Sequence, residues 1–292
     1  MSFRSGFVSI IGRPNAGKST LLNSILGEKI SIVSPKPQTT RNVVRGVKNL
    51  DGCQIVFLDT PGIHKGKGLL NEFMVKQAVS SIRDVDAVVL LVEADRTVSE
   101  DDLYIIKALE RLKCPVLLGI NKVDRVDKRL ILPIIDRYTK MYAFKDVIPL
   151  SALKGEGVEL LVNTLSALLP EGPKYFPDDV LTDVPERFIA AEIVREKVFI
   201  FTREEIPYSV AVTIDRFEEK KEVISIAATI NVERDSQKGI VIGKGGAMLK
   251  KIGTAAREDI EKLLASKVFL ELFVRVQKEW TKKPGALKEF GY

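Results

Sequence analysis

The chain has 292 residues and a mass of 32.5 kDa, more than one compact core usually needs, so we expect two domains. Hydrophobic residues make up 45% and charged residues 29%, which excludes a disordered, fibrous or disulfide-rich chain. Two cysteines and one histidine also exclude a Cys/His zinc cluster. We expect no signal peptide, because the N-terminus has no apolar h-region and no cleavage site. No apolar run reaches the roughly 18 residues of a membrane span, and we expect a cytoplasmic location.

The net charge of +6 is unevenly distributed along the chain. Residues 1–170 carry a net +6, residues 171–237 a net −6 and residues 238–292 a net +6. A basic final segment is typical of a polyanion-binding surface, and equally of a solvated helix face. Charge by itself does not separate these two interpretations.

Strand-like and helix-like segments alternate through the first 170 residues. We predict strands at 7–11, 43–48, 54–58, 87–92, 116–120 and 147–149, and helices at 18–26, 101–112, 128–141 and 158–169. This alternation predicts an α/β domain with a mostly parallel sheet and helices on both faces. Ligands of such sheets bind at the loops beyond the carboxyl ends of the strands.

A second domain is predicted at 186–292, after a linker at 171–185 rich in Pro, Gly and Asp. Its predicted elements are a helix at 186–201, antiparallel strands at 208–217 and 223–232, a helix at 247–264 and a strand at 267–276. This order of helix, strand, strand, helix and strand indicates a small α+β domain.

A phosphate-binding loop follows the first predicted strand and opens a helix. The pattern G-x-x-x-x-G-K-[ST] is formed by Gly12, Arg13, Pro14, Asn15, Ala16, Gly17, Lys18 and Ser19, and Thr20 belongs to the same predicted nucleotide site. The backbone N–H groups and the helix N-terminus can surround phosphate oxygens. Lys18 supplies a positive charge near the β- and γ-phosphates, and the Ser19 hydroxyl can ligate Mg²⁺. A simple connecting turn is the weaker interpretation.

The tetrapeptide Asp59, Thr60, Pro61 and Gly62 follows the apolar strand at 54–58. A carboxylate at a strand end is well placed to hold Mg²⁺ through water, and Gly62 can bring a backbone N–H close to the γ-phosphate. Alone, this tetrapeptide is a turn as often as a switch. After a phosphate loop, it indicates a segment that senses the γ-phosphate.

Asn121, Lys122 and Asp124 follow the strand at 116–120. The Asp124 carboxylate can accept hydrogen bonds from N1–H and the N2 amine of guanine, which adenine lacks. Such a difference can discriminate by about 10⁴ or more. Asn121 would brace the phosphate loop and the base, and the Lys122 stem can lie over the purine ring.

A further loop follows the strand at 147–149 and contains Ser151, Ala152 and Leu153. The Ala152 N–H could donate to guanine O6. In order and position, the five motifs resemble those of the translation-factor-related GTPases; they lie at 12–19, 39–41, 59–62, 121–124 and 151–153.

This resemblance implies GTP or GDP and Mg²⁺ as cofactors, with Ser19, Thr40 and Asp59 at the metal. It makes Thr40 the switch-I threonine, whose hydroxyl ligates Mg²⁺ only when the γ-phosphate is present, with Thr39 as the alternative. Catalytic roles fall to Lys18, Thr40 and Gly62. Loss of the γ-phosphate would release the segments at 30–41 and 63–70.

The sequence departs from Ras-like enzymes after Gly62, where they place a water-orienting glutamine and this chain has Ile63. We therefore expect slow intrinsic hydrolysis, with water positioned by backbone groups or by a partner. His64 as a base is a weaker interpretation than an exposed loop histidine. Related GTPases with an asparagine at the position of Asn15 use it to help hold K⁺, so K⁺ is a candidate cofactor.

A G-x-x-G loop precedes the predicted helix at 247–264. The candidate RNA-binding residues are Ile242, Gly243, Lys244, Gly245, Gly246, Leu249 and Lys250. Such a loop can press its backbone against nucleic-acid phosphates, and the apolar neighbours can form a groove for unstacked bases. A helix-capping turn and a second nucleotide loop are the competing interpretations. The element order of the domain resembles the type II KH fold, which favours RNA.

A GTPase domain followed by such a domain resembles the Era family of bacterial ribosome-assembly GTPases over essentially the whole chain. The resemblance implies binding to the 3′ end of small-subunit 16S ribosomal RNA and a role in small-subunit biogenesis. It also implies a loose peripheral contact with the inner membrane, and we expect a monomer that does not bind DNA. Two alternatives stay open. The C-terminal domain could bind a protein or membrane partner, or the switch could gate another reaction, for which no catalytic residues are evident.

Overall fold

The computed structural model describes residues 2–202 and 206–292, which form two compact units. Of the described residues, the first comprises 2–31, Thr40–Gly66 and Phe73–Asp183. The second comprises Ile32–Thr39, Lys67–Glu72 and the described residues of 184–292. Two short segments of the first 170 residues therefore group with the C-terminal part of the chain.

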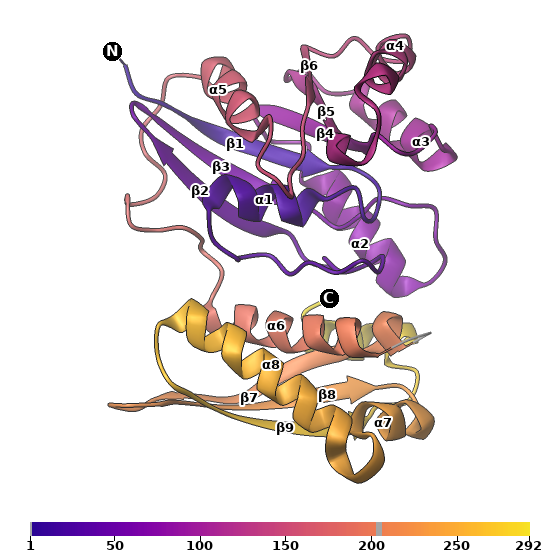
Figure 1. The fold of residues 1–292 in the computed structure, drawn as a ribbon, viewed down its shortest axis with the longest axis vertical. Helices are drawn as coiled ribbons and strands as arrows, with labels where there is room; N and C mark the ends of the chain where they lie inside the picture. Colours follow the sequence, from indigo (N-terminus) through magenta and orange to yellow (C-terminus); the bar gives the residue numbers. More distant parts are fainter. Residues whose placement is uncertain (1, 203–205) are drawn as a thin grey trace. The chain divides into compact units, whose positions relative to one another are not determined.

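A six-stranded sheet in the order β2-β3-β1-β4-β5-β6 forms the centre of the first unit (Figure 1). Its strands are β1 Arg4–Ile11, β2 Val44–Leu50, β3 Cys53–Asp59, β4 Ala87–Glu93, β5 Val116–Asn121 and β6 Asp146–Pro149. Neighbouring strands are parallel except for the antiparallel pair β2 and β3. Every residue of β3, β4 and β5 is buried, because both faces of such a sheet are covered. The predicted α/β fold is confirmed.

Helices cover both faces of this sheet (Figure 1). They are α1 Lys18–Leu26, α2 Leu69–Ser80, α3 Glu100–Leu109, α4 Ile131–Thr139 and α5 Val158–Leu168. Helices α1 and α5 contact each other and β3, whereas α2, α3 and α4 contribute to one buried cluster with β4 and β5. Helix α2 is not predicted from the sequence, because its apolar residues are spread around the helix rather than along one face.

The segment predicted as a linker is ordered against the first unit. Val47 of β2 donates its N–H to the Leu181 carbonyl at 2.8 Å, and the Gln54 amide of β3 donates to the Phe176 carbonyl at 2.8 Å. This stretch thus runs along the sheet, although Pro173, Pro177 and Pro185 are exposed to solvent.

The second unit contains a three-stranded sheet in the order β7-β8-β9. Its elements are α6 Glu186–Phe201, β7 Ala211–Glu219, β8 Ile224–Val232, α7 Asp235–Ile242, α8 Ala247–Leu264, β9 Val268–Val276 and α9 Pro284–Glu289. Strands β7 and β8 are antiparallel, and β8 and β9 are parallel. Helices α6 and α8 contact each other and the sheet.

The order of elements in this unit corrects the sequence prediction in three places. Helix α7 lies between β8 and the G-x-x-G loop, and α9 follows β9; neither is predicted. Gly239 and the β-branched residues of α7 disfavour an isolated helix, so its packing against α8 and β9 stabilises it. Strand β7 starts at Ala211 rather than at residue 208, because Ile206–Ser209 forms a 3₁₀ turn.

Among the helices of the described residues, none is both long enough and apolar enough to traverse a bilayer.

Candidate functional site

The phosphate loop connects β1 to α1, with Lys18 at the start of the helix. Lys18 is buried, and its ammonium group donates to the carbonyls of Gly12 at 3.2 Å and Arg13 at 2.9 Å. Burial lowers the pKa of Lys18 to about 8, although Asp59 and Glu93 oppose this shift. Within the described residues, the buried cation thus lacks a strong anionic contact of the kind that a phosphate would supply.

Three oxygen ligands predicted for Mg²⁺ converge at the end of β3. Ser19 Oγ donates to Asp59 Oδ2 at 2.6 Å and lies 2.7 Å from Thr40 Oγ1. Because the single hydroxyl proton of Ser19 is given to Asp59, the Thr40 hydroxyl donates in the second bond. These oxygens are the type of ligand that Mg²⁺ prefers.

Asp59 provides an independent test of whether a cation fits this position. The residue is fully buried, and its Oδ1 has no hydrogen-bond partner among the described residues. Burial also raises the pKa of Asp59, although hydrogen bonds from Ser19 and Ser31 and the charge of Lys18 oppose this shift. An orphaned, desolvated carboxylate oxygen beside two hydroxyls fits a divalent cation well.

The two switch-I threonine candidates face different partners. The Thr39 hydroxyl donates to the Lys36 carbonyl at 2.7 Å, three residues earlier in the chain. The Thr40 hydroxyl is the one that lies beside Ser19. This geometry favours Thr40 as the metal ligand.

The segment after Asp59 packs directly on the phosphate loop. A Cβ at Gly62 would lie 2.6 Å from the Pro14 backbone, so the close approach requires glycine. The Ile63 N–H donates to the Gly12 carbonyl at 3.1 Å, and Thr60 Oγ1 donates to the Ile10 carbonyl at 2.8 Å.

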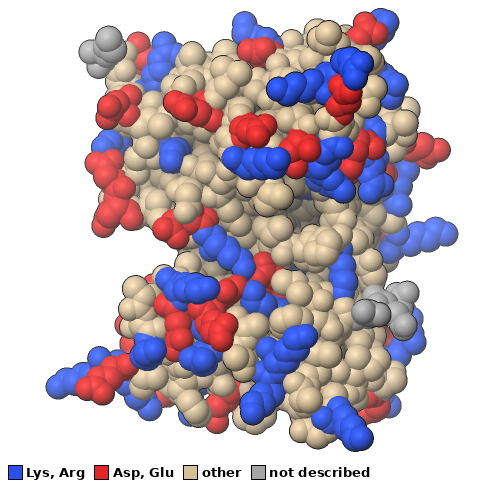
Figure 2. Space-filling model, in the orientation of Figure 1, with Lys and Arg blue, Asp and Glu red and all other residues tan. Residues whose placement is uncertain are grey.

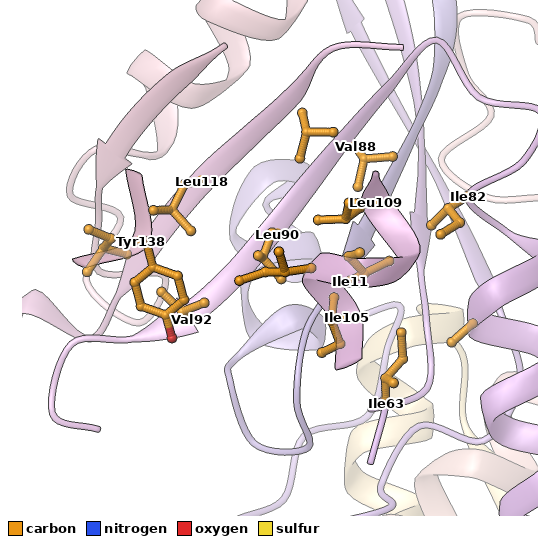
Figure 3. Close-up of a cluster of buried hydrophobic side chains, with 14 of the residues drawn as sticks. Ile11, Ile63, Ile82, Val88, Leu90, Val92, Ile105, Leu109, Leu118 and Tyr138 are labelled. Atoms are coloured by element: carbon orange, nitrogen blue, oxygen red, sulfur yellow. The ribbon is translucent and has the colours of Figure 1, made fainter. Parts of the chain in front are cut away.

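Ile63 belongs to the hydrophobic core rather than to the nucleotide pocket. It is 1% exposed and joins the buried cluster of β1, β4, β5, α2, α3 and α4, where Figure 3 labels it. A side chain held there cannot orient water, in agreement with its apolar character. His64 is half-buried, with Nδ1 3.3 Å from the Gly62 carbonyl.

Asn121 joins the phosphate loop to the loop after β6. Its amide nitrogen donates to the Ala16 carbonyl at 2.8 Å, and its amide oxygen accepts from the Ala152 N–H at 2.9 Å. Gly17 allows this contact, since a Cβ there would lie 2.2 Å from the Asn121 amide nitrogen. Asn121 therefore links the phosphate loop to the loop after β6. Its predicted contact with the base stays a prediction, as does donation by the Ala152 N–H, which here is given to Asn121, to guanine O6.

Lys122 and Asp124 flank the position predicted for the base. Lys122 donates to the Asn15 carbonyl at 2.8 Å and forms an ion pair with the buried Glu93. A hydrogen bond from Ser151 lowers the pKa of Asp124, so its carboxylate is ionised and able to accept. Leu153 is 80% exposed, beyond the contacts that order this loop.

Several residues absent from the sequence prediction support the site. Glu93, at the end of β4, holds Lys122, and Ser31 donates to Asp59 Oδ2 at 2.6 Å. Asn23 of α1 fixes Ser31 by accepting its N–H at 2.9 Å. Glu93 could have been found because it ends an apolar strand on the same sheet edge as Asp59 and Asn121. Ser31 and Asn23 carry no local signal.

The G-x-x-G loop connects α7 to α8 in the second unit. Gly243 caps α7 with φ 72°, and Gly246 precedes α8 with φ 81°. Lys244 and Gly245 are exposed, whereas Ile242 and Leu249 are half-buried beside them. Lys250 is exposed in the first turn of α8. The structure thus presents a backbone loop with one cation and apolar flanks, as RNA binding requires.

Acidic and basic side chains are interspersed over the second unit on the face drawn in Figure 2. The acidic and basic stretches of the sequence do not form two separate patches there. Ion pairs between them give the reason, since Lys197 of α6 pairs with Asp259 of α8, and Arg216 of β7 pairs with Glu271 of β9.

The fold and both sites define a P-loop GTPase with a C-terminal KH domain. Residues 7–122 match the family described as 50S ribosome-binding GTPase, and residues 205–281 match the KH domain family. The chain belongs to the GTPase Era family. It is 61% identical over 292 residues to GTPase Era of Geobacter metallireducens, covering 99% of this chain and 98% of the relative. It is also 59% identical over 291 residues to GTPase Era of Geotalea uraniireducens, and this match covers 99% of this chain and 98% of the relative.

Two solved structures are similar over their full length. One is Era in complex with MgGDPNP and nucleotides 1506–1542 of 16S ribosomal RNA, and the other is a variant of Aquifex aeolicus Era bound to GDP.AlF4⁻. Each is 42% identical to this chain with a TM-score of 0.96, and the match covers 99% of both chains.

Proposed function

We propose that this GTPase is a molecular switch that binds the 3′ end of 16S ribosomal RNA through its KH domain and assists small-subunit biogenesis. The observation that carries the switch is the convergence of Ser19, Thr40 and the orphaned Asp59 oxygen beneath the phosphate loop. The solved relative of similar length that holds 16S RNA supports the choice of RNA.

Nucleotide binding uses charges and donors that the loop has already oriented. Lys18 exchanges its carbonyl partners for phosphate oxygens, which restores a strong anionic contact to a buried cation. Ser19, Thr40 and Asp59 would hold Mg²⁺, which when bound neutralises charge on the β- and γ-phosphates. Asp124 selects guanine, and Asn121 holds the phosphate loop and the loop after β6 together.

Hydrolysis depends on backbone groups because the residue after Gly62 is apolar and buried. Gly62 lies against Pro14 of the phosphate loop. From this position, its N–H would donate to the γ-phosphate. A fixed dipole of this kind stabilises developing charge but supplies no base. We therefore propose a slow intrinsic rate, with Asn15 and K⁺ as contributors.

RNA binding uses the G-x-x-G loop, with Lys244 at a phosphate and Ile242 and Leu249 beneath unstacked bases. The family description that matches residues 7–122 names the 50S subunit. It covers the GTPase domain alone, whereas the RNA-bound relative covers the whole chain. We therefore favour the small subunit.

The remaining partner proposals concern assembly and location. We propose a cytoplasmic monomer with a loose peripheral contact at the inner membrane, as the family resemblance implies. Light scattering of the purified chain and its sedimentation with anionic vesicles test these two points.

The nucleotide proposal is tested by titrating the full chain with GTP, ATP and xanthosine triphosphate. The wild type should prefer GTP to ATP by about 10⁴ or more. Asp124→Asn replaces an acceptor with a donor, so it should lose GTP affinity and gain affinity for xanthine, which carries an oxygen at C2. Equal binding of GTP and ATP by the wild type would contradict the proposal.

The RNA proposal is tested with a labelled fragment of the 16S 3′ end that spans the nucleotides held by the solved relative. The double variant Lys244→Asp with Gly245→Asp should lose tight binding while keeping GTP affinity. Lys220→Asp is the matched control, because Lys220 lies in the β7–β8 turn at the opposite end of β8 from α7. Absence of RNA binding by the wild type would favour a protein or membrane partner.

A further inference from the structure

Three acidic residues form the first turn of α3: Glu100, Asp101 and Asp102. The Ser99 hydroxyl and N–H both donate to Asp102 Oδ2, at 2.9 Å and 2.8 Å, and the Asp102 N–H donates back to the Ser99 hydroxyl. This capping box fixes the turn. None of the three acids belongs to a predicted motif, yet each of them binds a segment outside the helix.

Asp102 ties this turn to the phosphate loop. It is 1% exposed, and its Oδ1 lies 3.2 Å from Nε of Arg13. The Arg13 Nη2 is buried and has no hydrogen-bond partner among the described residues, so the pair with Asp102 is the contact that compensates this cation. Separating such a pair would leave an uncompensated buried charge. The start of α3 and the start of the phosphate loop are therefore held together.

Asp101, the neighbouring residue, binds the segment 62–65. Its Oδ1 accepts the Lys65 N–H at 2.9 Å. Two residues earlier, the Ile63 N–H donates to the Gly12 carbonyl at 3.1 Å, and the Ile63 side chain is buried in a cluster that also contains residues of α3 (Figure 3). The backbone of this segment is therefore attached to the phosphate loop at one point and to α3 at another.

The third acid, Glu100, makes a different kind of contact. Its carboxylate lies 3.2 Å from the Lys65 ammonium group, and the two side chains are 83% and 58% exposed. An ion pair this open to solvent contributes little, because water screens it and both long side chains lose entropy. The bond of Asp101 differs because it holds the main chain of Lys65 rather than the end of a mobile side chain.

We infer that the first turn of α3 positions the segment 62–65 for GTP hydrolysis, with Asp101 as a positioning residue and Asp102 as its link to the phosphate loop. Ile63 offers no polar atom to an attacking water, so the rate depends on where the backbone groups of this segment lie. Two adjacent residues of one capped turn hold the segment and the phosphate loop, which sets the spacing between them. This inference rests on the proposed hydrolysis by backbone groups.

The test compares the single-turnover rate of GTP hydrolysis by the full chain with its affinity for GDP. Asp101→Leu should lower the rate about three- to tenfold, the factor that one hydrogen bond of this kind contributes. GDP affinity should change less than about twofold, because GDP lacks the phosphate that the segment is proposed to contact. Asp101→Asn should keep most of the wild-type rate, because its amide oxygen can accept the same N–H. A merely structural role would instead lower GDP affinity by the same factor as the rate.

Glu100→Leu is the matched control, since it removes one acidic charge from the same helical turn but no bond to the main chain of the segment 62–65. It should keep the wild-type rate. A wild-type rate in Asp101→Leu overturns the inference, and so does a rate in Asp101→Asn as low as that in Asp101→Leu. Either result leaves the proposed hydrolysis by backbone groups intact.

His64→Ala tests that proposal separately. We expect a rate close to that of the wild type. A loss of about a hundredfold, with GTP affinity unchanged, would show that a side chain supplies the base and would overturn the proposed hydrolysis by backbone groups.

Discussion

Lys18 shows how burial and function oppose each other at a single residue. The fold removes this ammonium group from water and provides it with two carbonyls instead of an anion. Its pKa therefore falls to about 8, which stores free energy that a bound phosphate can recover. The pKa of Asp59 shifts in the opposite direction: burial raises it, because burial favours the neutral carboxylic acid until a cation binds.

The lowered pKa of Lys18 predicts that nucleotide affinity depends on pH. Phosphate binds the protonated amine, so affinity should be constant below pH 8 and should fall as the pH rises through about 8. Calorimetry at about pH 8.5 in two buffers of different ionisation enthalpy should detect uptake of roughly 0.7 proton per GTP. The same experiment near pH 6.5 is the control and should show no uptake by this group. Equal proton exchange at both values would contradict the assignment.

At the scale of elements, Asn121 links the phosphate loop to the loop after β6, which is predicted to contact the base. Strands β1 and β5 are not neighbours in the sheet, since β4 lies between them. The Asn121 amide spans the gap by bonding Ala16 on one side and Ala152 on the other. Base recognition and phosphate recognition are therefore mechanically linked, even though they lie far apart in the sequence.

Gly17→Ala should break this link. Its Cβ would displace the Asn121 amide, so we expect weaker GTP binding by about 1–3 kcal/mol and a lower melting temperature. Gly27→Ala is the matched control, because Gly27 also has a left-handed φ of 79° but open space where the Cβ would lie. It measures the cost of backbone strain alone. Equal GTP affinities in the two variants would show that the contact with Asn121 does not matter for binding.

At the scale of the whole molecule, charge is mixed by folding. The acidic stretch 171–237 supplies α6, β7 and β8, and the basic stretch 238–292 supplies α8 and β9, so their charges pair within one unit. A net +6 on residues 238–292 therefore overstates the charge that RNA meets. RNA affinity should depend on a few exposed cations at the G-x-x-G loop.

We predict that Lys244 contributes measurably to the salt dependence of RNA affinity. Replacing it with Ala should reduce the slope of log affinity against log salt by about 0.7, as expected for one contact to a single-strand phosphate. Lys220→Ala should leave the slope unchanged. Equal slopes in all three proteins would remove Lys244 from the phosphate contacts.

The class of fold and most of the candidate nucleotide site can be predicted from local patterns of amino acids. The phosphate loop, Asp59–Gly62 and Asn121–Asp124 are local patterns at strand ends, and a parallel sheet brings strand ends to one edge. Buried strands can also be predicted, because short apolar runs are typical of strands covered on both faces. Helices α2 and α7 cannot be predicted in this way, since their residues favour a helix only when packed.

The contacts that support the sites exist only in the assembled fold. The contacts of Glu93 with Lys122, of Ser31 with Asp59 and of Arg195 with Thr39 join residues separated by 28 to 156 positions. No local pattern encodes such contacts, because burial and geometry select the partners after the elements have assembled. The same reason explains why Ile32–Thr39 groups with the second unit, although it lies within the first 170 residues and Thr40 belongs to the first unit.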